Sequence, residues 1–248
     1  MLSFVVPAYN EELELPSTLA SINCAAHEAQ RTHEIIVVDD ASTDRTAEIA
    51  AKAGARVIVI DRRQIAASRN AGARAAKGDI LFFVDADTRI TGQHIVQAIA
   101  ALKAGYAGGS ALVEIDGAPV WARLFLKIFS IVYFGLNFGA GAFLFTTRKI
   151  FDRAEGFDEE LFVGEEVYFS LALRKIGRFK VLKEPIVTSG RKLRIYSCGE
   201  VLKNTLFVLL RGPSGARSRV GLGIWYDGKR ETTSVAADPD THLMASSR

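Results

Sequence analysis

Short, continuous runs of apolar residues alternate with longer amphipathic segments along the first half of the chain. The runs are typical of strands that are buried on both faces of a sheet, and they cover residues 3–8, 34–40, 55–61, 80–84 and 106–116. The segments between them carry small and apolar residues at helical spacing, with Pro16 at one helix start and Gly54 at one helix end. The pattern predicts an α/β fold with a mostly parallel central sheet and helices on both faces.

Carboxylates follow two of these predicted strands at the point where each strand ends. Asp39 and Asp40 end the second run, and Asp85 and Asp87 follow the fourth. Ligands of parallel sheets bind beyond the carboxyl ends of the strands. Asp85 and Asp87 point the same way if the chain stays extended between them, and such a pair suits a hard cation such as Mg²⁺ or Mn²⁺. A carboxylate at the second strand end can accept hydrogen bonds from a nucleobase or a ribose.

The second half of the chain begins with a run that is almost wholly apolar, residues 120–145. Arg123 and Lys127 lie near its start and glycines break its second half, so we do not expect it to span a membrane. Two interpretations stay open. The run is either a buried helix followed by a glycine-rich strand, or a helix that lies in a membrane interface.

Polar sequence returns after this run and predicts a short helix, a turn at 156–158 and a second helix. Acids at 165–166 and bases at 174–175 mark the two ends of that second helix, in agreement with the helix dipole. A last pair of strands is predicted around Pro185. A helix over 201–210, apolar on one side, is a second candidate for membrane contact.

Length and charge refine this picture. A chain of 248 residues can bury one core, so we expect a single domain over residues 1–230 and a disordered tail over 231–248, which is small and polar. The net charge is only +3, but basic residues strongly outnumber acidic ones between 174 and 230. Such a field fits a nucleotide diphosphate, anionic lipid, nucleic acid or a plain solvated face, and charge alone does not choose among them.

The cellular setting is suggested by three weaker signals. The two cysteines, Cys24 and Cys198, lie far apart without metal-ligand spacing, which favours a reducing compartment. The N-terminus lacks the basic and apolar regions of a signal peptide. The mean hydropathy of +0.15 is slightly high for a freely soluble protein. We therefore expect a cytoplasmic protein that lies at the inner face of the membrane.

Six segments, taken in order, resemble the motifs of family 2 glycosyltransferases. They are FVVPAYNEE at 4–12, VVDDASTD at 37–44, SRNAG at 68–72, FVDAD at 83–87, EGFDEEL at 155–161 and GEE at 164–166. The resemblance implies a GT-A fold, a nucleotide-sugar donor (a UDP-, GDP- or dTDP-sugar), a divalent Mg²⁺ or Mn²⁺ ion and inversion at the anomeric carbon. It divides the domain into a nucleotide-binding half, 1–112, and an acceptor-binding half, 113–230, with no nucleic-acid partner.

The resemblance also implies a role for each matching position. Pro7, Tyr9 and Glu11 would line the nucleotide pocket, Asp39 would meet the base beside Asp40, Arg69 would lie near the nucleotide, Asp85 near the ribose or metal, and Asp87 on the metal. Glu165 and Glu166 would begin the acceptor-side helix, with Glu166 as the general base.

Elementary chemistry agrees with this division of roles. Displacing a nucleoside diphosphate needs positive charge on the leaving phosphates and a base for the acceptor hydroxyl on the opposite side. One carboxylate cannot do both, so a second acidic pair from a distant segment makes sense. Without the resemblance, Glu165 and Glu166 are better explained as acids at a helix start that favour the helix dipole, and the resemblance reverses that preference.

Two departures from the family pattern affect the site. Glu stands at 166 where relatives carry Asp, so the base role could pass to the neighbouring glutamate. Many relatives have a histidine as a further metal ligand in the region that Thr188, Ser189 and Arg191 occupy here, and none of the four histidines of this chain falls in that region. Arg191 and Lys192 are candidates to hold the diphosphate, against the alternative of a basic surface loop. The absence of Gln-x-x-Arg-Trp after residue 166 argues against a processive polysaccharide synthase.

Two other functions compete with glycosyl transfer. FFVDADT superficially matches the Asp-x-Asp nucleophile of phosphatase-like hydrolases, although such motifs usually follow the first strand and three strands precede this one. A catalytically silent nucleotide-binding protein that uses its basic last third on a membrane is the other alternative.

Overall fold

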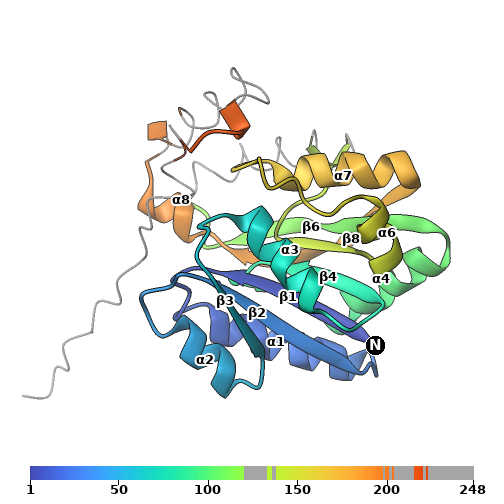
Figure 1. Cartoon of the computed structure of the whole chain (residues 1–248), viewed down its shortest axis with the longest axis horizontal. Coiled ribbons are helices and arrows are strands. Elements are labelled where there is room, and N and C mark those ends of the chain that lie inside the picture. Colours follow the sequence, from blue (N-terminus) through green and yellow to red (C-terminus); the bar gives the residue numbers. More distant parts are fainter. Residues whose placement is uncertain are drawn as a thin grey trace, which may run out of the picture.

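The computed structural model describes residues 1–119, 133–135, 138–197, 199–200, 203, 215–219 and 222. Within them an eight-stranded mixed sheet runs in the order β3-β2-β1-β4-β7-β6-β8-β5 (Figure 1). The strands are β1 (Leu2–Ala8), β2 (His33–Asp40), β3 (Arg56–Ile60), β4 (Ile80–Val84), β5 (Thr88–Arg89), β6 (Tyr106–Asp116), β7 (Phe143–Thr147) and β8 (Arg178–Ser189).

The predicted parallel half of the sheet is confirmed. β1 lies between β2 and β4, β3 adds to β2, and all these pairings are parallel. Every residue of β1 is buried, which explains why its sequence is apolar apart from Ser3 and does not alternate between apolar and polar residues. The carboxyl ends of β1, β2 and β4 therefore meet at one edge, where polar residues follow them.

Helices cover both faces of the sheet (Figure 1), as predicted. They are α1 (Leu15–Glu28), α2 (Thr46–Lys52), α3 (Ile65–Ala75), α4 (Gly92–Lys103), α6 (Arg148–Arg153), α7 (Glu165–Ile176) and the short α8 (Arg191–Ile195). On one face Phe4 belongs to a core with Leu19 of α1 and Ile95 of α4. On the other face Val5 belongs to a core with Ala66 of α3 and Phe169 of α7.

Small residues let α3 lie close against the sheet. A Cβ atom added to Gly72 would come within 2.3 Å of Cγ1 of Val5. Such an approach has no room for a side chain, so the alanine- and glycine-rich sequence of this helix follows from its packing. The close contact fixes the height of Arg69, one turn earlier on the same helix, relative to the strand ends.

The second half of the sheet departs from the predicted pattern. β8 is one twelve-residue strand, not a pair of strands around Pro185. The register against β6 jumps from the Ala111–Leu182 pair to the Leu112–Pro185 pair, so the residues between form a bulge that accommodates the proline. β7 joins antiparallel between β4 and β6, at the end of the apolar run where a strand was one of two interpretations.

The two segments predicted to contact a membrane, and the tail predicted to be disordered, consist mostly of residues that the structure does not describe. Most of the 120–145 run, most of 201–210 and the whole tail 231–248 lie outside the described residues. In the described part of the chain, no helix is long and apolar enough to cross a membrane.

Candidate active site

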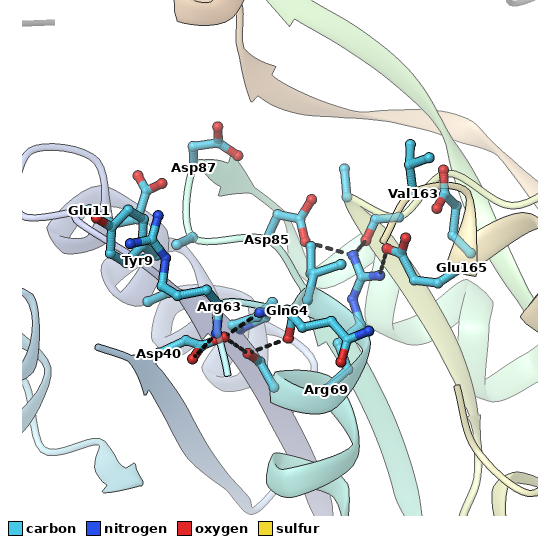
Figure 2. A pocket seen from close by; sticks show the side chains of 18 of the residues that line it. Tyr9, Glu11, Asp40, Arg63, Gln64, Arg69, Asp85, Asp87, Val163 and Glu165 are labelled. Carbon is cyan, nitrogen blue, oxygen red and sulfur yellow. Dashed lines mark hydrogen bonds and ion pairs between the residues drawn. The ribbon is translucent and has the colours of Figure 1, made fainter. Parts of the chain in front are cut away.

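A cavity opens at the carboxyl ends of β1 and β4, bounded by the loop after β3 and by the start of α7 (Figure 2). It brings together the predicted site residues Pro7, Tyr9, Glu11, Asp40, Arg69, Asp85, Asp87, Glu165, Glu166 and Arg191. Asp39 is the exception. Its carboxylate accepts a hydrogen bond from the Ser42 N–H at 3.3 Å, and it does not line the cavity.

Asp85 and Asp87 are not presented by an extended chain, so that premise of the sequence analysis is wrong. β4 ends at Val84, and the Thr88 N–H donates to the Asp85 carbonyl at 3.0 Å, which closes a turn. The Thr18 hydroxyl donates to the Ala86 carbonyl at 2.8 Å and holds that turn. In Figure 2, Asp87 lies on the side of Glu11 and Asp85 lies nearer to Glu165.

Arg69 is a buried cation that joins the two ends of the predicted site. Its side chain is 1% exposed, and it bonds Glu165 Oε1 through Nη1 at 2.6 Å and Asp85 Oδ1 through Nη2 at 2.9 Å. Nη2 also donates to the Gly141 carbonyl at 2.9 Å. A guanidinium offers its donors in a fixed plane, so this fork sets the positions of both carboxylates. Arg69 therefore holds carboxylates from two different segments of the chain in place within the site.

Arg69→Met is expected to lower the free energy of unfolding by about 3–5 kcal/mol, because it leaves the buried Glu165 carboxylate without its cation. Urea denaturation measures the change. Arg74→Met on the same helix is the control, since Arg74 is 67% exposed and lies 3.7 Å from Glu159. The control should lose less than about 1 kcal/mol. Equal losses in the two variants would show that the buried pair contributes nothing beyond a surface ion pair.

Arg191 is buried and paired, so the alternative of a basic surface loop is wrong. Both of its terminal nitrogens bond the two oxygens of Glu11, and Nη2 also lies 3.3 Å from Asp87 Oδ2. Burial alone would lower the pKa of Arg191, but Glu11 and Asp87 outweigh it and hold the pKa above its ordinary value. The Thr188 hydroxyl donates to Asp87 Oδ1 at 3.2 Å. Glu11, Arg191 and Thr188 together fix the Asp87 carboxylate.

The charge of the cavity tests whether a divalent cation fits. Six carboxyl groups line the cavity against three guanidinium groups. A diphosphate would meet net negative charge there unless a further cation came with it. The described residues contain no group of three or more acidic, histidine or cysteine side chains able to hold a metal by themselves. Mg²⁺ and Mn²⁺ commonly bind through one or two carboxylates plus substrate phosphates, so Asp85 and Asp87 fit such an ion together with a donor.

The two glutamates at the start of α7 have different surroundings. Glu165 is 4% exposed and bonded to Arg69, whereas Glu166 is half-buried in the cavity wall. In the described part of the chain, no side chain forms a hydrogen bond or ion pair with the Glu166 carboxylate. Removal from water raises the pKa of Glu166 to about 8, repulsion from Glu165 adds to the rise, and Arg69 partly offsets it. Glu166 is therefore the better placed of the two to take up a proton.

Asp40 organises the loop that follows β3. Its carboxylate accepts hydrogen bonds from the N–H groups of Arg62, Arg63 and Gln64, each at 2.7 Å, and from the Ser68 hydroxyl at 3.0 Å. Four donors leave this carboxylate little capacity for a ligand. Asp40 thus shapes the cavity wall, a structural role that the motif does not reveal.

Several residues that line the cavity were not predicted from the sequence. Arg63, Gln64, Gly141, Phe162 and Val163 line the cavity without belonging to any conspicuous pattern. Gln64 Nε2 donates to the Leu161 carbonyl at 3.1 Å and so ties the loop after β3 to the loop before α7. The proximity of Phe162 and Val163 to the GEE segment was the one signal that could have identified them.

The segment EGFDEEL is anchored by the SRNAG segment. Asn70 Nδ2 donates to the Phe157 carbonyl at 2.8 Å, and the Phe157 N–H donates to Asn70 Oδ1 at 2.9 Å. The Asn70 amide thus pairs with the Phe157 backbone as a neighbouring strand would, and this pairing holds the loop that precedes α7 against α3. Two of the six motif segments therefore act on each other, and they place the carboxylates of α7 at the cavity.

The sequence of this chain is similar to those of known proteins. Residues 3–154, more than half of the chain, match the sequence model of Glycosyl transferase family 2. An undecaprenyl-phosphate 4-deoxy-4-formamido-L-arabinose transferase of Aeromonas hydrophila is 33% identical over 113 residues, 43% of this chain and 35% of the relative. A 4,4'-diaponeurosporenoate glycosyltransferase of Staphylococcus haemolyticus is 40% identical over 105 residues, 40% of this chain and 27% of the relative. The chain thus spans about a third of the length of such relatives.

Solved structures show the same fold. S. aureus TarS 1-349 in complex with UDP-GlcNAc matches with a TM-score of 0.62 and 20% identity, over 85% of this chain and 66% of that one. The mannosyltransferase PcManGT from Pyrobaculum calidifontis, in complex with GDP-Man and Mn²⁺, matches with a TM-score of 0.62 and 19% identity, over 84% and 61%. The expected GT-A fold is confirmed. Because the family model matches more than half of its residues, the chain belongs to glycosyl transferase family 2.

Proposed function

We propose that this enzyme transfers a sugar from a nucleoside-diphosphate donor to an acceptor hydroxyl in a single displacement that inverts the anomeric carbon. The observation that supports this most is the arrangement of acids around one cavity. Asp85 and Asp87 follow β4, whereas Glu165 and Glu166 enter from α7. Figure 2 shows Asp87 and Glu165 on opposite sides with Asp85 between them. A leaving group and an incoming acceptor need this separation.

Asp85 and Asp87 would hold the divalent ion, and the nucleotide would lie towards Tyr9. When bound there, Mg²⁺ or Mn²⁺ supplies the positive charge that stabilises a departing nucleoside diphosphate. Arg191 fixes Asp87 and Arg69 fixes Asp85, so neither carboxylate needs to reorganise when the donor arrives. The P. calidifontis structure contains Mn²⁺ together with GDP-Man, which supports a divalent ion that accompanies the donor.

Glu166 would take the proton from the acceptor hydroxyl. Its carboxylate lines the cavity and has a pKa raised to about 8, which makes it a stronger base than an exposed glutamate. Glu165 remains bonded to Arg69 and positions the start of α7. The base role therefore stays with Glu166 despite the extra methylene relative to the aspartate that is usual in the family.

The acceptor that we propose is linked to a lipid. Relatives are named for undecaprenyl phosphate and for 4,4'-diaponeurosporenoate as the molecules that receive the sugar. The name of the first relative also favours a second candidate, in which the attacking oxygen belongs to a lipid phosphate and not to a hydroxyl. A phosphate monoester is largely ionised at pH 7 and needs no base, so the two candidates differ in their dependence on Glu166.

Donor binding tests the proposed site directly. Thermal unfolding should be followed with UDP-, GDP- and dTDP-sugars, in Mn²⁺ and in EDTA. At least one donor is expected to raise the melting temperature in Mn²⁺ and to have little effect in EDTA, because binding stabilises the folded state in proportion to affinity. An equal shift in EDTA would contradict the role of Asp85 and Asp87, and no shift with any donor would contradict the proposed function.

The pKa of Glu166 predicts how the rate depends on pH. A general base must be ionised, so the rate at saturating substrates should rise about tenfold per pH unit on the acid side and level off near pH 8. Glu165→Gln removes one repelling charge and should move the inflection to lower pH. Initial rates between pH 5.5 and 9.5 measure both profiles. A wild-type profile that is flat over this range would contradict the base assignment.

A further inference from the structure

The guanidinium of Arg63 lies over an aromatic ring inside the cavity. Its Cζ atom is 3.3 Å from the centre of the Tyr9 ring, and both residues line the cavity (Figure 2). This is van der Waals contact, so nothing can enter between the guanidinium and that face of the ring. A ligand on this side of the cavity meets the guanidinium first.

The backbone of Arg63 is held in an unfavourable conformation. Its φ is 48°, in the left-handed region that residues with a Cβ rarely adopt. The Arg63 N–H donates to Asp40 at 2.7 Å, and its carbonyl accepts a bond from Arg219 Nη2. The preceding Arg62 is held in the same way, with its carbonyl 2.6 Å from Arg219 Nη2. Such strain persists where the surroundings determine the backbone, and it is common at ligand sites.

The charge of Arg63 is available to a ligand. Of the guanidinium groups that line the cavity, Arg69 pairs with Asp85 and Glu165, and Arg191 pairs with Glu11 and Asp87. Within the described ranges no carboxylate pairs with the guanidinium of Arg63. Its neighbour Arg62, by contrast, points to Glu159, 3.8 Å away.

We propose that Arg63 is a nucleobase-contacting residue: the base of the donor stacks on the outer face of its guanidinium, which Tyr9 supports from behind. Guanidinium planes stack on bases as aromatic rings do. Asp40 ends β2 directly beneath this loop, which puts the contact at the nucleoside end of the cavity and away from Asp85 and Asp87. The assignment rests on the proposed donor site and adds a residue that sets its affinity for the base.

Stepwise ligands separate a base contact from a phosphate contact. Binding of uridine, UMP and UDP, of thymidine, dTMP and dTDP, and of guanosine, GMP and GDP would be measured by calorimetry in Mn²⁺ for the wild type and for Arg63→Ala. Loss of one stacking partner should weaken binding about tenfold, by the same factor for the nucleoside, the monophosphate and the diphosphate of the preferred base. A loss that appears only when phosphate is present would overturn the assignment. Unchanged or tighter binding by Arg63→Ala would also overturn the assignment. Tighter binding would show that Arg63 only covers the Tyr9 ring.

Two further variants separate the side chain from the loop. Arg63→Gly removes the guanidinium and also relieves the strain at positive φ, so it should weaken binding as much as Arg63→Ala. Wild-type affinity in Arg63→Gly would overturn the contact. Arg62→Ala is the matched control and should bind as the wild type does. If the wild type binds none of the three nucleotide series, the proposed function fails, whereas binding that does not depend on Arg63 refutes this inference alone.

Discussion

Glu166→Gln is expected to bind the nucleotide-sugar donor as the wild type does and to turn over about a thousandfold more slowly. The amide keeps the size of the side chain but cannot accept a proton from the acceptor. Donor binding should survive because the carboxylates that we assign to the metal, Asp85 and Asp87, follow a different element. Calorimetry gives the donor affinity, and acceptor-dependent release of nucleoside diphosphate gives kcat.

Glu160→Gln is the control for this experiment. Glu160 lies in the loop before α7, its side chain is 71% exposed and it pairs with Arg217 at 3.2 Å. It should keep the wild-type rate. A loss of less than about tenfold in Glu166→Gln would favour an acceptor oxygen that is already ionised, as in a lipid phosphate, and would remove the base role. Loss of donor binding together with turnover would contradict the division of roles.

Asp87→Ala is expected to abolish the effect of Mn²⁺ on donor binding and to weaken that binding at least about a hundredfold. The reason is that the ion contributes several kcal/mol to donor binding, and about 1.4 kcal/mol corresponds to each tenfold change in affinity. The fold should survive, since Arg191 keeps both bonds to Glu11. Calorimetric titrations with the preferred donor, in Mn²⁺ and in EDTA, measure the change.

Asp79→Ala provides a matched control for that variant. Asp79 directly precedes β4, at the opposite end of the same strand, and its side chain is 93% exposed. The control should respond to Mn²⁺ as the wild type does. If Asp87→Ala kept its metal response, the ion would have to be held elsewhere, and the excess of carboxylates in the cavity would need another explanation.

The parallel half of the fold could be predicted from the sequence because its strands carry local signals. The middle of each of β1, β2 and β4 is buried, so each strand contains a run of consecutive apolar residues. The place of β7 between β4 and β6 depends on pairing across distant segments, which no local pattern encodes. The bulge in β8 is likewise a matter of register, and Pro185 suggested a break where the strand continues.

In the site, too, local motifs could be recognised from the sequence, whereas contacts between distant segments could not. Residues within ordered motifs, such as Asp87 and Glu166, could be found because the motif supplies their context. Burial of Arg191 could not, since its partner Glu11 lies at the other end of the sequence. Arg63 belongs to no motif, and the role that we propose for it follows only from its contact with Tyr9 and its positive φ.

The central claim is that this cavity catalyses metal-dependent glycosyl transfer. The measurement that tests it most directly is the release of nucleoside diphosphate from UDP-, GDP- and dTDP-sugars, with and without Mn²⁺, in the presence of vesicles that contain either a lipid-linked sugar, which offers hydroxyl acceptors, or undecaprenyl phosphate. We predict release from one class of donor that requires Mn²⁺ and is accompanied by a glycosylated lipid. No release from any donor, together with release of inorganic phosphate, would contradict the account.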